Sequence, residues 1–149
     1  MRAGDLATPY PTVEFSTPVV EAARSLLGQN LAGLIVVDGS GRPSTILPGT
    51  QVLRLAVPAY CQDDPTLARV IDEPSADVFL RGLGERTVAE SLPRGERREL
   101  PVVYPKATVL EVAAVMARTR SPLVAVAEPG GRLLGAITLD ALLERMLAP

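Results

Sequence analysis

Two short apolar runs near the end of the chain set the pattern from which the other elements can be predicted. Leu123–Ala127 and Leu133–Ile137 are separated by Pro129–Gly131, which predicts a β-hairpin with a tight turn. Thr138 follows as a suitable N-cap, and Asp140 falls in the first turn of the expected helix, where the helix dipole favours an anion. Apolar residues then recur at i, i+3, i+4 and i+7 on one helix face: Leu139, Leu142, Leu143 and Met146.

The same order of apolar and polar positions occurs about 90 residues earlier, which indicates an internal repeat. Val19–Ala23 corresponds to Val109–Ala113, and Leu34–Val37 corresponds to Leu123–Val126. Each copy reads as strand, helix, hairpin of two strands, and helix. One helix cannot cover both its own sheet and its neighbour's, so we expect the two halves to pack together about a pseudo-twofold axis.

The first helix of each copy carries start and stop signals. In the first copy, Thr17 is the expected N-cap, Pro18 the first helical residue and Gly28 the residue that ends the helix. In the second copy, Thr108 and Glu111 form a capping-box pattern. The predicted buried faces are Val19, Ala23, Leu26 and Leu27 in the first helix and Val109, Val112, Ala113 and Met116 in the second.

The segment between the copies predicts two short helices instead of a disordered linker. Asp64–Pro65 should start the first helix, Glu73–Pro74 should end it, and Ser75 should begin the second. We expect Phe79 to pack on the body of the protein or on a partner subunit. The apolar positions assigned to these helices are Leu67, Val70, Ile71, Val78, Phe79 and Leu80.

Composition excludes several classes of function. The 149 residues have a net charge of -2 and a single lysine, Lys106, which argues against a nucleic-acid surface. Because there is no histidine and only one cysteine, Cys61, the chain offers no Ser-His-Asp or Cys-His site, no His-ligated zinc and no intrachain disulfide. No apolar run approaches the length of a membrane span. We expect a cytoplasmic protein that is not an enzyme, needs no cofactor or metal, and binds neither nucleic acid nor a membrane.

The two copies resemble a tandem pair of CBS domains, an arrangement called a Bateman module. The second copy carries the pattern best, in Gly135-Ala136-Ile137-Thr138 followed by Leu142-Leu143. The resemblance covers residues 1–58 and 85–149 and leaves 59–84 as a helical insert. It implies an α/β fold of two β-α-β-β-α units in a stand-alone bacterial protein. The abundance of Arg, Ala and Pro, with a single Lys, indicates a GC-rich bacterial genome.

The resemblance also implies a ligand. In this family, the cleft between the two copies binds adenine nucleotides such as AMP, ADP and ATP, or S-adenosylmethionine. The ribose is held by a Thr or Ser after the Gly-apolar-apolar step, which is Thr138 here, and by an Asp three residues later, which falls on Ala141. Asp140 is one residue early, and this places it about 100° away around a helix. The corresponding positions of the first copy are Pro48 and Gln51.

Phosphate recognition is assigned by the same resemblance to Arg120, which precedes Ser121-Pro122, with Lys106 as a second candidate. The complete set of implied ligand-binding residues is Arg120, Ser121, Pro122, Ile137, Thr138, Asp140 and Lys106. Each has a structural alternative: an arginine at a helix C-terminus interacts with the helix dipole, Thr138 is a helix cap with or without a ligand, and Asp140 is an ordinary first-turn carboxylate.

Two functions stay open at this point. The first is a ligand-sensing regulatory module that forms a homodimer through its helical faces, the helix Leu139–Leu147 among them. The second is a structural or protein-interaction module of the same fold, with degenerate nucleotide sites and the helical insert as its docking surface. Neither hypothesis identifies the regulated protein.

Overall fold

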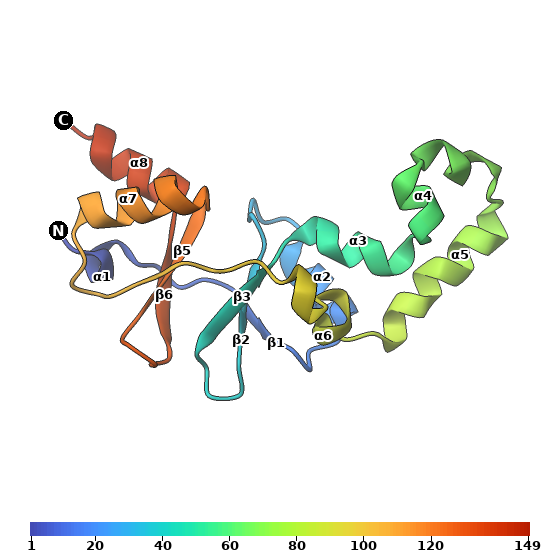
Figure 1. Cartoon of the computed structure of the whole chain (residues 1–149), viewed down its shortest axis with the longest axis horizontal. Coiled ribbons are helices and arrows are strands. Elements are labelled where there is room, and N and C mark those ends of the chain that lie inside the picture. Colours follow the sequence, from blue (N-terminus) through green and yellow to red (C-terminus); the bar gives the residue numbers. More distant parts are fainter. The chain divides into compact units, whose positions relative to one another are not determined.

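The chain folds as a mixed α/β protein with two three-stranded sheets (Figure 1). The computed structural model describes the backbone of residues 1–149 and every side chain except that of Phe79, so the predicted packing of Phe79 lies outside the described residues. Contacts divide the chain into two compact units. Unit 1 contains Met1–Thr12, Ile35–Ile46 and Arg98–Pro149, and unit 2 contains Val13–Leu34 and Leu47–Arg97.

The strands and helices follow the predicted repeat. The strands are β1 (Thr12–Glu14), β2 (Leu34–Val37), β3 (Pro43–Leu47), β4 (Val102–Val103), β5 (Leu123–Ala127) and β6 (Leu133–Thr138). The α-helices are α1 (Ala3–Leu6), α2 (Val19–Leu26), α3 (Gly49–Ala56), α4 (Ala59–Asp63), α5 (Glu73–Gly82), α6 (Val88–Ser91), α7 (Val109–Thr119) and α8 (Leu139–Leu147). Short 3₁₀ helices are η1 (Pro65–Val70), η2 (Leu83–Glu85) and η3 (Arg94–Glu96). The β-α-β-β-α order therefore occurs twice, as β1-α2-β2-β3-α3 and β4-α7-β5-β6-α8.

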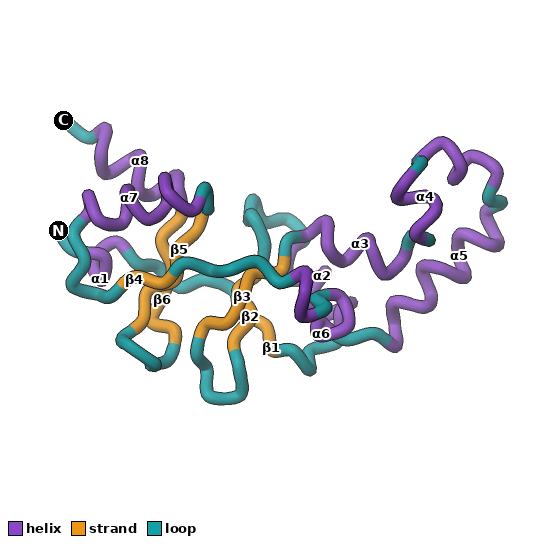
Figure 2. Tube along the Cα trace, viewed as in Figure 1, coloured by secondary structure: helices purple, strands orange, loops and turns teal.

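In unit 1, the central strand β5 is parallel to β4 and antiparallel to β6. Leu123 pairs with Thr138, and the register shifts between Val126 and Ala127, where the hairpin turns (Figure 2). Because strand β5 is buried on both faces, all five of its residues are apolar. The predicted hairpin is confirmed.

Helices α7 and α8 lie side by side over one face of this sheet (Figure 1). Alternate strand residues face them, including Val124, Val126 and Ile137, and pack with Val112, Met116 and Leu142 from the helices. The predicted stripe of α7 is confirmed, with Val109 and Ala113 partly buried against this core. Of the four apolar residues predicted for α8, only Leu142 is buried.

The opposite face of β5 and β6 is covered by residues that lie far away in sequence. Leu123, Ala125 and Ala136 pack with Ile35 and Val37 of β2 and with Leu100. Thr8 exchanges two backbone hydrogen bonds of 3.0 Å with Ala136, so the first residues of the chain pair with β6. Gly135 allows this close approach, because a Cβ there would lie 3.0 Å from the Thr8 carbonyl oxygen and would force the two segments apart by a few tenths of an ångström.

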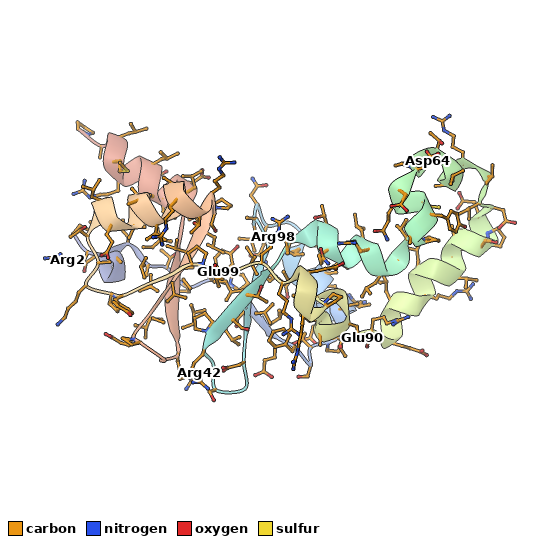
Figure 3. The ribbon with its side chains drawn as sticks, viewed as in Figure 1. Arg2, Arg42, Asp64, Glu90, Arg98 and Glu99 are labelled. Carbon is orange, nitrogen blue, oxygen red and sulfur yellow. The ribbon has the colours of Figure 1, made fainter. Side chains whose placement is uncertain are left out.

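Polar contacts fix the loops of unit 1. Arg42, in the turn between β2 and β3, forms a 3.1 Å ion pair with Asp38. Arg98 and Glu99 lie on the extended segment that leads into β4 (Figure 3). The buried Thr45 hydroxyl donates to the Arg98 carbonyl, and Thr45 forms a β-bridge with Glu99.

Unit 2 contains α2, α3, α6 and the helical insert. The backbone N–H of Val19 donates to the Arg86 carbonyl at 2.9 Å, and the N–H of Val88 donates to the Thr17 carbonyl at 2.9 Å. Thr87 and Glu90 form a reciprocal capping box at the start of α6. These bonds join the start of α2 to the start of α6.

Several predicted boundaries in unit 2 are wrong. Thr17 does not cap α2, because its hydroxyl instead accepts a hydrogen bond from the Glu14 N–H at 2.9 Å, and Pro18 takes the N-cap position. Leu27 is exposed because the helix has already ended at Leu26, whereas Val19 and Ala22 provide its buried face. Gly28 follows with a left-handed φ of 73°.

The insert forms helices at the expected places with shifted ends. Asp64 caps η1 by accepting from the Thr66 N–H at 3.2 Å, as the Asp-Pro signal predicts. Glu73–Pro74 opens α5 instead of ending the preceding helix, because Asp72 supplies the cap by accepting from the Ser75 N–H at 2.9 Å. Val70, Val78 and Leu80 are exposed and do not form a buried stripe. The division at 1–58, 59–84 and 85–149 stays a prediction.

Candidate functional site

The loop Arg120–Pro122 and the start of α8 meet at one end of the β5–β6 hairpin. The backbone N–H of Leu139 donates to the Pro122 carbonyl at 2.9 Å, and Thr138 is the strand partner of Leu123. This contact brings the predicted residues Arg120, Ser121 and Pro122 close to Thr138 and Asp140. Residues from two segments that are separated by the whole hairpin therefore share one small region of unit 1.

Arg120 has an unusual backbone conformation at this point. It ends α7 in the left-handed region, with φ 54° and ψ 31°, and it is the only residue other than glycine with a positive φ among the described residues. Glycine is the usual residue in this position, because a Cβ makes the left-handed conformation unfavourable. The side chain is exposed and forms no ion pair within the part of the chain that the structure describes. Its guanidinium is available for an anion.

The two hydroxyl groups of the region, those of Ser121 and Thr138, differ in their remaining capacity to donate a hydrogen bond. Ser121 Oγ donates to the Leu123 carbonyl at 2.6 Å, so its hydrogen is already used by the backbone. Thr138 Oγ1 accepts from the Ala141 N–H at 3.2 Å as the N-cap of α8, which confirms the predicted cap. A hydroxyl can accept and donate at the same time, so Thr138 keeps a hydrogen for a ligand.

Ile137 and Asp140 lie on either side of Thr138 in contrasting environments. The Ile137 side chain is fully buried in the core under α7 and α8, and its backbone lies in the ladder opposite Val124, so the side chain is not accessible to a ligand. Asp140 is exposed in the first turn of α8, where it interacts favourably with the helix dipole. It also borders a shallow hollow of about 430 Å³ with Leu143, Glu144, Leu147 and Ala148.

Lys106 lies apart from the other predicted residues. It follows β4, whose Val103 pairs with Val126 near the far end of β5, whereas Thr138 pairs with Leu123 at the near end. The eleven residues of α7 separate Lys106 from Arg120, a length of about 16 Å. The Lys106 carbonyl accepts a 3.2 Å hydrogen bond from Arg2. The structure therefore does not bring Lys106 together with Arg120 in unit 1.

An apolar groove of about 500 Å³ runs between α7 and α8 and ends at the Arg120–Pro122 loop. Ala113 and Ala117 line the α7 side of the groove with small side chains. Three residues of α8 that line it are half-exposed: Leu139 (41%), Leu143 (42%) and Met146 (50%). Sequence reasoning missed the contribution of α7. The i, i+4 spacing of the two alanines is the signal that could have indicated it.

The corresponding place in unit 2 is built differently. Pro48 caps α3 without a side-chain hydrogen bond, and Gln51 stands where unit 1 has Ala141. The Gln51 amide nitrogen donates to the Ser91 carbonyl at 2.9 Å and to Glu96 Oε2 at 3.2 Å. Gln51 is thus engaged by its own chain.

The carboxyl groups whose pKa values are lowered lie outside the candidate region. The backbone N–H of Arg42 is the main cause of the lowered pKa of Asp38, side-chain hydrogen bonding from Ser75 lowers that of Asp72, and side-chain hydrogen bonding from Arg86 lowers that of Glu90. All three act as caps or turn residues. Among the described residues, no group of three or more His, Cys, Asp and Glu side chains is placed to hold a metal ion, and no helix is both long and apolar enough to cross a membrane.

The repeated fold corresponds to a known domain family. The family model for the CBS domain matches the chain twice, at residues 3–49 and 96–148. The chain belongs to the CBS-domain family and carries a tandem pair of these domains. CBS pairs are regulatory modules, and no catalytic family is indicated. No curated protein matches the sequence.

Solved structures agree with this assignment. A CBS domain-containing protein of unknown function from Kribbella flavida is 47% identical, with a TM-score of 0.89 over 99% of both chains. CBSX2, whose structure is a complex with AMP, is 18% identical with a TM-score of 0.67 over 98% of this chain and 96% of its own. The cytosolic domain of the Mg²⁺ channel MgtE, in complex with ATP, is 24% identical with a TM-score of 0.64 over 97% of this chain and 48% of its own. The last two likenesses show the shared fold.

Proposed function

We propose that the protein is a cytoplasmic regulatory module that binds an adenine nucleotide through the second CBS copy, in the cleft that the family resemblance implies. The observation that carries the proposal is that the loop of Arg120 contacts the start of α8 through its backbone, beside Thr138, at one end of β5 and β6. The Arg120 side chain forms no ion pair within the described residues, and the Thr138 hydroxyl keeps its hydrogen. The complexes of CBSX2 with AMP and of the MgtE domain with ATP support the ligand class.

The chemistry of the region fits a phosphate and a ribose. Arg120 can form charge-assisted hydrogen bonds to a phosphate, each worth roughly 1.5 to 3 kcal/mol. Thr138 can donate to a ribose oxygen while it continues to cap α8. Asp140 contributes a negative charge on a different side of the helix from Ala141, so its direct role as a ribose ligand is the least supported part of the set. We expect affinity to depend more on Arg120 than on Asp140.

A thermal-shift screen tests the proposal. AMP, ADP, ATP and S-adenosylmethionine are each added to the wild-type chain, to Arg120→Ala and to the matched control Arg118→Ala. A ligand at a hundred times its dissociation constant stabilises the folded state by about 2.7 kcal/mol, which raises the Tm by several degrees. The shift should be present in the wild type and the Arg118 variant and absent in the Arg120 variant. An unchanged Tm with every compound would refute nucleotide binding.

A homodimer formed through α7 and α8 is the second part of the proposal. The apolar groove and the half-exposed α8 leucines form a surface of the kind that associates with another protein surface. Leu143→Glu should convert the protein to a monomer in light scattering at micromolar concentration, whereas Leu134→Glu, on an exposed strand position of the same unit, should leave the mass unchanged. A wild-type monomer at high micromolar concentration contradicts this assembly.

The insert favours a second candidate function. Val70 is 84% exposed, and Tyr60, Val78 and Leu80 are also exposed, so the insert presents apolar side chains that no described contact covers. A protein-interaction module with degenerate nucleotide sites would use this surface. Absence of nucleotide binding by a folded protein, together with loss of partner binding in Val70→Ser, is the result that supports this alternative.

A further inference from the structure

The negative charge of the chain is concentrated in the helical insert, residues 59–84. The insert carries two arginines and five carboxylates: Asp63, Asp64, Asp72, Glu73 and Asp77. The rest of the chain carries thirteen basic and twelve acidic side chains, so the net charge of -2 changes to +1 when the insert is left out. A segment of one sign attracts a partner of the other sign and repels a partner of its own.

Among the described residues, the carboxylates of the insert form no ion pair. The ion pairs that the structure contains lie outside the insert, and Arg81 Nε donates to the backbone carbonyl of Asp77 at 3.4 Å instead of to a carboxylate. Glu73 and Asp77 are exposed one turn apart on α5, and like charges at this spacing repel each other. Over the same part of the chain, no group of three or more acidic, His or Cys side chains is placed to hold a metal ion. The negative charge of the insert is therefore available to a cationic group from outside the chain.

Exposed apolar side chains accompany the carboxylates. Five large ones are exposed in the insert: Tyr60, Leu67, Val70, Val78 and Leu80. On α5, Glu73, Asp77 and Leu80 are spaced i, i+4 and i+7, so two carboxylates and a leucine share one helix face. A partner that matches both kinds of side chain is itself amphipathic, with basic residues beside apolar ones.

The base of the insert is fastened to α3, so this surface is already formed in the free protein. Gln62 Nε2 donates to the Val57 carbonyl at 2.7 Å and to the Arg54 carbonyl at 3.2 Å, and Arg54 Nε donates to Gln62 Oε1 at 3.3 Å. Cys61, next to Gln62, is buried. Asp64 lies at the outer end of the insert (Figure 3). A preformed surface loses less conformational entropy when a partner binds.

The sign of the charge selects among the possible occupants of this surface. Nucleic acids and anionic lipid surfaces carry the same sign as the insert and are repelled. A second copy of the chain that paired through this surface about a twofold axis would place five carboxylates against five others. The CBS family model leaves residues 50–95 unmatched, so the shared fold of the family does not account for the insert.

We propose that the insert is a docking surface for a cationic amphipathic segment of another protein, with Lys or Arg side chains against Glu73 and Asp77 and apolar side chains against Leu80. The inference rests on the second candidate function, for which it names the chemistry of the partner, and it requires no nucleotide. Because the contact is partly electrostatic, its affinity falls as salt screens the charges.

Fluorescence anisotropy of the full chain with a labelled model peptide tests the charge of the partner. The probe is a helical peptide of about 18 residues, built from leucine and lysine with its leucines on one face. Its matched control has glutamate in place of every lysine. The lysine peptide should bind with an affinity that falls as salt is added, and the glutamate peptide should not bind. Absence of binding by the lysine peptide, or equal binding of both peptides, would overturn the inference.

Charge-removing substitutions locate the surface that the peptide contacts. Glu73→Gln combined with Asp77→Asn should weaken binding of the lysine peptide about tenfold, because two exposed ion pairs are lost. The matched control is Glu111→Gln combined with Glu128→Gln, which removes the same charge from exposed positions outside the insert and should bind as the wild type does. Equal losses in the two double variants would show non-specific attraction to an acidic chain and would refute the docking surface.

Leu80→Ser tests the apolar part of the contact. It should weaken binding of the lysine peptide about fivefold, whereas Leu134→Ser, at an exposed strand position outside the insert, should leave the affinity unchanged. An unchanged affinity in Leu80→Ser would show that charge alone holds the peptide and would refute an amphipathic partner. A wild-type dimer in light scattering that Leu80→Ser converts to a monomer would assign the surface to a second copy of the chain instead.

Titration of the same preparations with AMP separates this inference from the proposed nucleotide site. The double variant of Glu73 and Asp77 should bind AMP as the wild type does, because neither residue belongs to the second CBS copy. If the lysine peptide binds and AMP does not, the docking surface stands and the nucleotide proposal fails. If AMP binds and the lysine peptide does not, the nucleotide proposal stands and the docking surface is wrong.

Discussion

Replacement of Arg120 by glycine should stabilise the free protein and weaken nucleotide binding at the same time. Arg120 occupies the left-handed region at φ 54° and ψ 31°, which costs a residue with a Cβ about 1 to 2 kcal/mol. Glycine removes this cost. Glycine also raises the conformational entropy of the unfolded chain, and this second effect offsets about 0.4 to 1 kcal/mol of the gain. The expected net gain is about 0.5 to 1 kcal/mol, or about 2 °C in Tm for a chain of this size.

Thermal and urea unfolding of three variants test this reasoning. Arg120→Gly should unfold at a higher temperature than wild type, and Arg120→Ala should not, because alanine keeps the Cβ. Arg118→Gly is the matched control inside α7 and should lose about 1 kcal/mol, because its backbone is helical. If Arg120→Gly is less stable than Arg120→Ala, the backbone conformation is not strained and the argument for a functional arginine at this position loses its energetic basis.

Three further perturbations follow from the structure. Thr138→Ala should lose about 1 kcal/mol of stability through the missing cap of α8 and should also weaken AMP binding. Thr108→Ala, which removes the cap of α7, should lose stability alone. Urea midpoints measure the stability of each variant, and titrations with AMP measure its affinity. Gly135→Ala should destabilise the protein by about 1 to 3 kcal/mol, because its Cβ would lie 3.0 Å from the Thr8 carbonyl oxygen, and an unchanged urea midpoint would show that Thr8 can move away. The pKa of Asp38 is lowered on folding, so its contribution to stability is present above its unfolded pKa of about 3.9 and is lost as the pH falls through the lower folded value. Asp38→Asn should therefore reduce the loss of stability between pH 5 and pH 2, and identical pH profiles for the variant and the wild type would contradict this assignment.

Local signals in the sequence were sufficient to predict the hairpin and the helices of the second copy. The Pro129–Gly131 turn lies between two apolar runs, and the Thr108 and Thr138 hydroxyls cap the helices that follow them. Each cap depends on residues three positions apart, and the hairpin depends on one continuous stretch of fifteen residues. The prediction that Thr17 caps α2 is wrong, because its hydroxyl accepts from the N–H of Glu14, which precedes it, and the local sequence is compatible with both roles.

Contacts between distant segments could not be predicted in the same way. The pairing of Thr8 with Ala136 and the hydrogen bond from Gln51 to Ser91 join residues that are far apart in sequence, and each explains a residue whose role the local pattern left open. The left-handed conformation of Arg120 was also hidden, because such a position usually carries glycine. Of the predicted ligand set, the structure places Arg120, Ser121 and Pro122 on the loop beside Thr138 and leaves Asp140 next to a separate hollow. It places Lys106 elsewhere and buries the Ile137 side chain. Their role in ligand binding stays a prediction.

A crystal structure of the protein grown with saturating AMP tests the central claim most directly. We predict a bound nucleotide with a phosphate oxygen within hydrogen-bonding distance of the Arg120 guanidinium and a ribose oxygen accepting from the Thr138 hydroxyl. A crystal without a nucleotide, or nucleotide contacts that avoid both Arg120 and Thr138, would contradict the account.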